Sequence, residues 1–184
     1  MTSRVVVLAT LIALIGAACS DSTMDPVDRV GYSRLPAPDV SQTEFIVYST
    51  DPGGEVFAPV APEGELLLMY FGYLSCPDVC PTTLAEISDA LDIMPDDAAA
   101  RISVGMVSVD PDRDEGTAIS TYLDVFAERN HGLLAPDAAS LAESSEVFGV
   151  LYEVEEHEPG DTSYDVGHSA AVYVVDDRGL IIWE

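Results

Sequence analysis

The residues with the clearest chemical potential are two cysteines, Cys76 and Cys80, which are separated by three residues. Four positions apart on a helix, both sulfurs would lie on one face, and in a loop the same spacing allows a disulfide. Thiolates are soft ligands that select Cu(I), zinc or iron–sulfur clusters. The pair is therefore a candidate disulfide, a candidate redox couple or part of a candidate metal site.

The chain offers few further soft ligands, since it holds three cysteines and three histidines in all. A closed zinc site needs four ligands, and there is no second cysteine pair to complete one or to hold a cluster. A two-thiolate site points to copper, provided that an imidazole reaches it. We expect His131 to be an exposed residue at a helix end and His157 to lie in an acidic loop. His168 precedes a predicted strand, where ligands gather in such folds, and is the preferred candidate.

Apolar patterning predicts the elements that would position these residues. A buried strand is expected over residues 66–73, directly before the cysteines, and a second one over 102–109. Helical spacing of apolar residues predicts three helices: one after Pro81, one around 119–126 that closes near 130–132, and one that begins at 136–137.

Two hairpins complete the predicted fold. The first spans residues 44–60 with a turn at 51–54, and the second spans 169–183 with a turn at 176–179. An acidic loop is expected over 153–165. Strands that alternate with helices and finish on a hairpin predict an α/β sandwich of three layers.

The composition restricts the class of partner. The chain of 184 residues has 33 acidic residues, seven arginines, no lysine and a net charge of -26. Such a field disfavours nucleic acid and anionic membrane surfaces as partners. With three cysteines, a scaffold of several disulfides is excluded.

The N-terminal residues have the features of a targeting segment. Arg4 supplies a positive region, residues 5–15 are apolar, and the small residues 16–18 precede Cys19. This arrangement resembles the lipobox of bacterial lipoproteins, so we expect a signal peptide over 1–18 and lipidation of Cys19. The alternative is an ordinary cleaved signal peptide with Cys19 incidental. We expect a tether over residues 19–40, a domain over 41–184, and a location at the extracytoplasmic face of a bacterial cell membrane.

The stretch from Gly72 to Leu84, GYLSCPDVCPTTL, resembles the copper-site signature of the Sco/SenC family. Segments 107–114 and 122–126, and His168 with Ser169 and Tyr173, resemble further family motifs in the same order, and the match covers roughly residues 36–184. The resemblance implies a thioredoxin-like fold with an N-terminal β-hairpin and one copper ion bound by Cys76, Cys80 and His168. It implies delivery of copper to the binuclear centre of cytochrome c oxidase. The implied partners are the copper-bearing subunit and, as further candidates, periplasmic copper chaperones or thiol reductases.

Two departures from the family pattern concern the site and the fold. The family usually has Asp directly before the histidine, where this chain has Gly167, and Asp165 is the candidate substitute for that carboxylate. The family also continues into a closing helix after the last strand, whereas this sequence stops at Glu184. We therefore expect one face of the sheet to be partly uncovered.

The alternative function is an extracytoplasmic thioredoxin-like thiol–disulfide oxidoreductase with Cys76 and Cys80 as its redox pair. Redox thioredoxins place two residues between the cysteines rather than three, and a proline before the strand that here begins at Gly167. A binding module with a structural disulfide would leave His168 without a role. We therefore expect a metallochaperone rather than an enzyme.

Overall fold

The computed structural model describes residues 31–48 and 54–184. The predicted signal peptide, Cys19 and most of the turn at 51–54 lie outside the described residues. Within them, no helix is long and apolar enough to cross a membrane.

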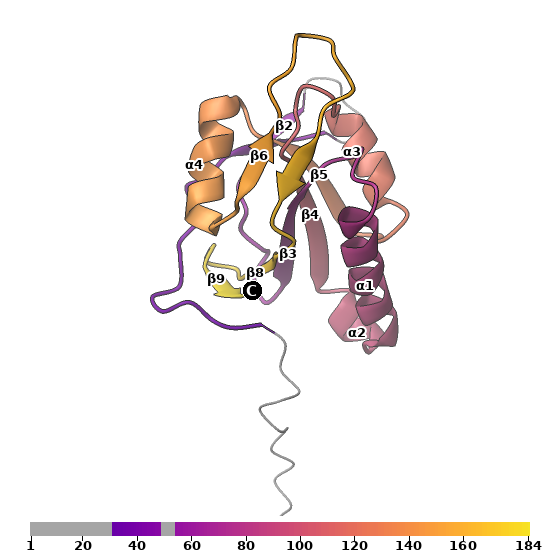
Figure 1. Ribbon diagram of the computed structural model, residues 1–184. Helices are drawn as coiled ribbons and strands as arrows, with labels where there is room; N and C mark the ends of the chain where they lie inside the picture. The colour runs from indigo at the N-terminus through magenta and orange to yellow at the C-terminus, as the bar shows by residue number, and fades with distance from the viewer. Residues whose placement is uncertain (1–30, 49–53) are drawn as a thin grey trace, which may run out of the picture. The chain divides into compact units, whose positions relative to one another are not determined.

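A seven-stranded sheet of order β2-β1-β5-β4-β3-β8-β9 forms the centre of the domain (Figure 1). Strands β3, β4 and β5 are parallel, and every other pair of neighbouring strands in this sheet is antiparallel. A separate two-stranded sheet consists of β6 and β7. The strands are β1 Phe45–Val47, β2 Glu55–Phe57, β3 Leu66–Gly72, β4 Ile102–Ser108, β5 Asn130–Leu134, β6 Tyr152–Val154, β7 Val166–His168, β8 Val172–Val175 and β9 Ile181–Trp183.

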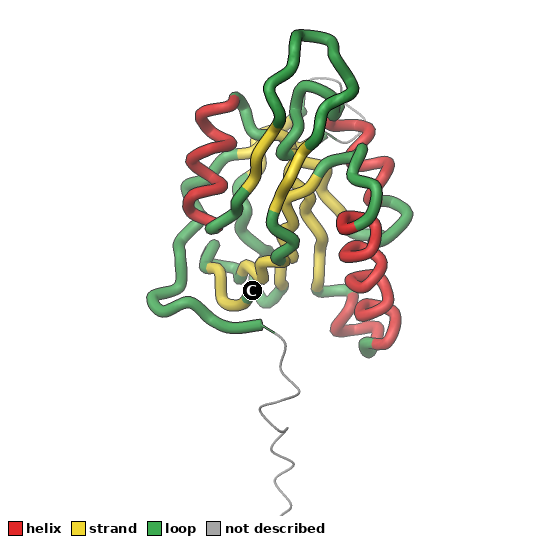
Figure 2. The backbone as a smooth tube through the Cα atoms, viewed as in Figure 1, coloured by secondary structure: helices red, strands yellow, loops and turns green. Residues whose placement is uncertain are grey.

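Helices cover both faces of this sheet. Figures 1 and 2 show α1 (Val79–Ile93), α2 (Asp96–Ala99) and α3 (Gly116–Leu123) on one side and α4 (Ala138–Phe148) on the other. The helix α4 begins at Asp137, whose side chain accepts a hydrogen bond from the Ser140 amide, and the left-handed Gly149 ends it. The predicted three-layer α/β sandwich is confirmed.

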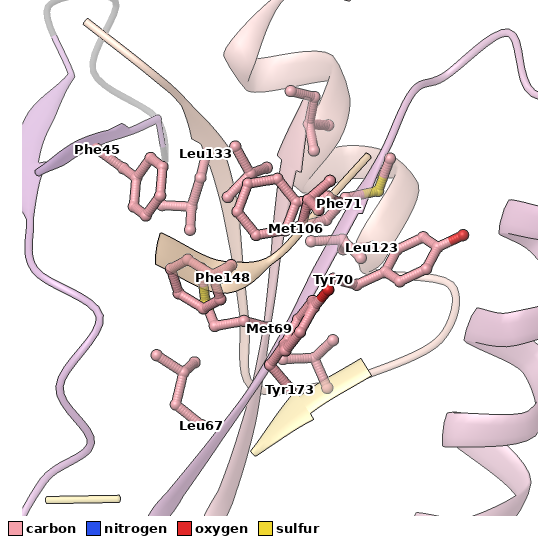
Figure 3. Close-up of a cluster of buried hydrophobic side chains, with 14 of the residues drawn as sticks. Phe45, Leu67, Met69, Tyr70, Phe71, Met106, Leu123, Leu133, Phe148 and Tyr173 are labelled. Carbon is pink, nitrogen blue, oxygen red and sulfur yellow. The ribbon is translucent and has the colours of Figure 1, made fainter. Parts of the chain in front are cut away.

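The core lies on both sides of β3, which explains why this strand is one unbroken apolar run. Phe71 contacts the rings of Phe148 and Tyr173 on the α4 side, whereas Tyr70 points to the opposite face. Figure 3 shows these buried side chains together with Met69. The strand that leads into the cysteines is thus anchored by packing on both faces.

The prediction of a helix that closes near residue 130 was wrong. The helix α3 ends at Leu123, and residues 130–134 form β5, a central strand between β4 and β1. Gly132 allows α3 to lie against this strand, because a Cβ at that position would come within 2.5 Å of the Ser120 amide. His131 is accordingly a half-buried strand residue that packs against Phe57, and not an exposed helix end.

The acidic segment is more ordered than a loop. Residues 152–154 and 166–168 pair as the antiparallel strands β6 and β7, with Tyr152 opposite His168. The first two residues of the expected loop over 153–165 therefore belong to β6, and the rest of it connects β6 to β7. This hairpin is the element that carries the candidate histidine.

The edge strand β9 is paired with the segment before β1. Tyr32 exchanges two backbone hydrogen bonds with Glu184, and Ile181 donates to the carbonyl of Pro38. Residues 32–40, which the sequence suggested as part of a tether, therefore lie along β9.

The two faces of the sheet differ in burial near its C-terminal strands. Leu67 and Tyr173 on the α4 side are at most 2% exposed. Leu68, Val172 and Val174 on the opposite face are only partly buried. Over β3 and β8, the face beside α1 is therefore less completely buried than the face beside α4.

Candidate metal centre

The two cysteines lie where β3 passes into α1. Cys76 is in the connecting loop, and Cys80 is in the first turn of the helix. The Cys80 amide donates a hydrogen bond to Cys76 Sγ at 3.3 Å, whereas the N-cap residue Asp78 makes no side-chain cap. The sulfur thus satisfies one of the free N–H groups at the helix N-terminus. Cys80 is fully buried and Cys76 is 9% exposed, so Cys76 is the more accessible thiol.

His168 brings the third donor to the same place. Its Nε2 lies 3.2 Å from Cys80 Sγ and 3.9 Å from Cys76 Sγ. The ligand atoms of the three residues all lie within 4.8 Å of one another, and no other such group of three occurs in residues 31–48 and 54–184. The chain therefore assembles two thiols and one imidazole, which suit a soft metal such as copper.

The orientation of the imidazole is determined by the backbone. Nδ1 lies 3.0 Å from the carbonyl oxygen of Ser169, which can only accept, so Nδ1 carries the proton. Nε2 is then left with its lone pair directed at the sulfurs. The proposed substitute carboxylate, Asp165, is exposed and pairs through its backbone with Glu155. The suggestion that Asp165 orients the ring was therefore wrong, and Ser169 takes this role.

Two tyrosines near the C-terminal end of β3 pack against the imidazole. The rings of Tyr70 and Tyr73 meet the His168 ring edge-on, with centroids 5.9 and 5.7 Å away. The Tyr73 hydroxyl donates to the carbonyl of Val166, two residues before His168. Tyr73 therefore ties the cysteine loop directly to the histidine strand.

A buried carboxylate supports the cysteine loop from behind. Asp114 Oδ2 accepts hydrogen bonds from the Leu74 amide at 3.0 Å and from the Ser108 hydroxyl at 2.6 Å. Burial raises the pKa of Asp114, and the two donors oppose that shift. Asp114 thereby joins the end of β4 to the loop that carries Cys76.

A second cluster fixes the connection between β6 and β7. Asp110 accepts from the Tyr164 hydroxyl at 2.6 Å and from Arg113 Nε at 2.5 Å. Arg113 also donates to the carbonyls of Thr162 and Tyr164 and lies over the Tyr164 ring, 3.7 Å from its centroid. His157 stacks on the same ring. These contacts attach the hairpin of His168 to the segment after β4.

The electrostatic setting keeps the inner thiol protonated. Burial raises the pKa of Cys80 to about 12, and the interaction with the Tyr70 side chain opposes that shift. With Nε2 of His168 unprotonated, the Cys80 S–H group points to it as a donor. Before metal uptake the inner pair is thus a thiol bonded to an imidazole, rather than a thiolate.

The predicted Cys76, Cys80 and His168 come together, whereas His157 lies against Asp112 and Tyr164 in the second cluster. Sequence reasoning did not identify Asp114, Arg113, Tyr164 or the two tyrosines that flank the imidazole. The segment 107–114 resembles a family motif, but nothing in its sequence indicates which partners its carboxylates take.

Comparisons with known proteins agree with this geometry. The family model SCO1/SenC matches residues 38–183. An SCO2-like protein of Rickettsia conorii is 31% identical over 129 residues, which are 70% of this chain and 62% of that protein. The human mitochondrial SCO2 homolog is 30% identical over 64% of this chain and 44% of its own length. The chain thus spans less than two thirds of these curated relatives.

Solved structures show the same fold. Apo Sco1 of Thermus thermophilus has a TM-score of 0.67 at 30% identity, with 84% of this chain and 85% of that chain covered. Copper-bound ScoI of Bradyrhizobium japonicum has a TM-score of 0.61 at 33% identity, with 76% and 86% covered. Taken with the match to the family model over most of its length, these results show that the chain belongs to the SCO1/SenC family.

Proposed function

We propose that this protein binds one copper ion through Cys76, Cys80 and His168 and delivers it to the binuclear copper centre of cytochrome c oxidase during assembly. The observation that carries the proposal is the convergence of these three side chains from a loop, a helix and a distant hairpin. Two thiolates and one imidazole match the softness of Cu(I) and also bind Cu(II). The copper-bound relative supports the same cargo.

The arrangement favours transfer of the ion over permanent storage. Cys80 lies at the bottom of the site, while Cys76 and the half-buried His168 lie at its open side. A partner thiolate or imidazole can therefore approach the metal beside Cys76 and replace the donors one at a time. Copper then moves between proteins without passing through water.

The proposal includes a location outside the cytoplasm. Residues 1–18 have the charge and hydropathy of a signal peptide, and Cys19 follows small residues as a lipidated cysteine does. A lipid on Cys19 would place the domain at the outer face of a bacterial cell membrane, where oxidase copper centres are assembled. Mass spectrometry of the membrane fraction with and without Cys19→Ser tests the modification.

Copper titration of the full chain tests the binding function. The chain carries Cys19→Ser, so that no third thiol competes. We expect one copper per chain, and thiolate-to-copper charge-transfer absorption in the Cu(II) form. His168→Ala should weaken binding at least about 10-fold, since it removes a direct ligand. The matched control His131→Ala should bind copper as the parent does, because its imidazole lies in β5 and packs against Phe57 instead.

The competing function predicts a different outcome. If the protein were a thiol–disulfide oxidoreductase, reductase activity would depend on Cys76 and Cys80 alone, and His168→Ala would bind copper as well as the parent. That result would overturn the copper proposal.

A further inference from the structure

One polar group beside the candidate copper site has no partner. The hydroxyl of Tyr70 is completely buried and has no partner in good hydrogen-bond geometry among the described residues, although the side chains of Cys80 and Thr83 lie close to it. A buried hydroxyl without a partner is costly, and such groups in native proteins call for an explanation. The loop, the helix and the histidine hairpin that surround it hold the three candidate copper ligands.

The Tyr70 ring lies against the inner cysteine and the histidine. Its centroid is 5.9 Å from that of the His168 ring. A Cβ added to Gly72 would come 2.8 Å from Tyr70 Cε1 and 2.9 Å from Cys80 Sγ, so ring and sulfur share the space that this glycine leaves open. A tyrosine hydroxyl is protonated at neutral pH, so that of Tyr70 can donate a hydrogen bond.

We propose that the Tyr70 hydroxyl donates a hydrogen bond to the Cys80 sulfur when copper is bound, and thereby favours the Cu(I) form of the site. This inference rests on the copper-binding function proposed above. Tyr70 would be a positioning and tuning residue rather than a ligand. Its role would resemble that of the groups around metal-bound sulfur that adjust reduction potentials in other copper proteins.

The charge of the sulfur explains why this hydrogen bond becomes stronger when copper binds. A neutral thiol is a weak acceptor, and Cys80 already directs its proton to His168. Copper takes the place of that proton, and the sulfur becomes a thiolate with lone pairs available. A hydrogen bond to a charged acceptor is stronger and shorter than one to a neutral group. In a buried site water does not compete for this hydrogen bond, so its stabilising effect is retained.

The consequence for the metal follows from the donor strength of the sulfur. A hydrogen bond withdraws electron density from the thiolate, which then donates less to the metal. Cu(II) depends on that donation more than Cu(I), so the bond favours Cu(I) and moves the charge-transfer absorption of the Cu(II) form to higher energy. Without the hydroxyl, both effects reverse.

The variant Tyr70→Phe, made in the full chain with Cys19→Ser, tests the proposal because it removes only the hydroxyl. We expect the Cu(II) charge-transfer band to shift to lower energy and the Cu(I) affinity, measured by competition with a chelator, to fall about 10-fold relative to the Cu(II) affinity. The apo variant should unfold at the same temperature as the parent or a higher one, because the lost hydroxyl had no partner.

The control is Tyr32→Phe, whose hydroxyl interacts with Glu184 rather than with a copper ligand. It should leave the band position and the Cu(I) affinity unchanged. If Tyr70→Phe has the band and affinity of the parent, the tuning role is wrong while copper binding stands. If the parent itself binds no copper, the proposed function fails, and this inference fails with it.

Discussion

Cys80 Sγ lies 3.2 Å from Nε2 of His168, although 88 positions separate the two residues. The imidazole donates its other N–H to the Ser169 carbonyl, so Nε2 is the acceptor and the buried thiol is the donor. The two inner donors of the site are thus already paired by a proton. A metal ion that binds both of them must displace that proton.

We therefore predict that copper uptake at neutral pH releases at least one proton for each ion bound. Anaerobic addition of Cu(I) to the weakly buffered protein, followed with a pH indicator, measures the number. The affinity for Cu(I) should rise with pH for the same reason. Cys80→Ala should release one proton fewer per bound ion, and equal release by this variant and the parent would contradict the assignment of the proton to Cys80.

The second prediction concerns the support beneath the cysteine loop. Asp114→Ala removes the acceptor shared by the Leu74 amide and the Ser108 hydroxyl, so the Leu74 N–H and the Ser108 O–H would each lack an acceptor. We expect a loss of about 1–3 kcal/mol in the free energy of unfolding, measured by urea denaturation, together with weaker copper binding. Asp112→Ala is the matched control, because this side chain is 76% exposed, and its unfolding should stay close to that of the parent. Equal stabilities for the two variants would exclude the supporting role.

The elements with strong periodic signals were predicted correctly from the sequence. The strands β3 and β4 are continuous apolar runs, and α1 repeats apolar residues at helical spacing, so burial alone identifies them. The strand β5 was missed because Asn130, His131 and Gly132 precede its two leucines, and its burial comes from pairing with β4 and β1. The hairpin of β6 and β7 was missed because acidic residues conceal its alternation.

For the candidate metal site, too, residues close together in the sequence could be predicted, whereas contacts between distant segments could not. Cys76 and Cys80 are visible as a pair because they are close in the chain. His168 could be proposed from its place before a strand and from the family resemblance, but its approach to the sulfurs depends on the hairpin that was not predicted. The tie from Asp114 to Leu74 spans 40 positions and depends on how two loops pack, which no local pattern records.

The third prediction concerns the pH dependence of the segment between β6 and β7. His157 lies with Nδ1 2.9 Å from the Glu155 carbonyl and Nε2 3.3 Å from Asp112 Oδ2, so both nitrogens face acceptors. These contacts, that with Glu155 first, raise the pKa of His157 above its ordinary value of 6.5. A raised pKa means that the protonated form stabilises the fold. This contribution is complete below about pH 6.5 and is lost as the pH rises through the higher pKa of the folded state.

Histidine NMR titration measures this prediction, and His131 provides an internal reference. Burial lowers the pKa of His131, so the two histidines should titrate on opposite sides of the ordinary value. Asp112→Asn should move the pKa of His157 down and leave that of His131 unchanged. A pKa of His157 at or below the ordinary value in the parent would show that the contacts with Glu155 and Asp112 do not form.

The last prediction follows from the charge of the whole chain. Against 33 acidic residues there are seven arginines, and the five that the structure describes are each bound to a carboxylate or a carbonyl: Arg34, Arg101, Arg113, Arg129 and Arg178. The remaining carboxylates repel one another, which destabilises the compact state.

Raising NaCl from about 0.1 to about 1 M shortens the screening length from about 10 to about 3 Å. We expect Tm to rise by about 2 to 8 °C, which corresponds to a gain of about 1–2 kcal/mol. The rise should shrink near pH 4, where many carboxylates are protonated, and a Tm that does not depend on NaCl at neutral pH would show that this repulsion does not limit stability.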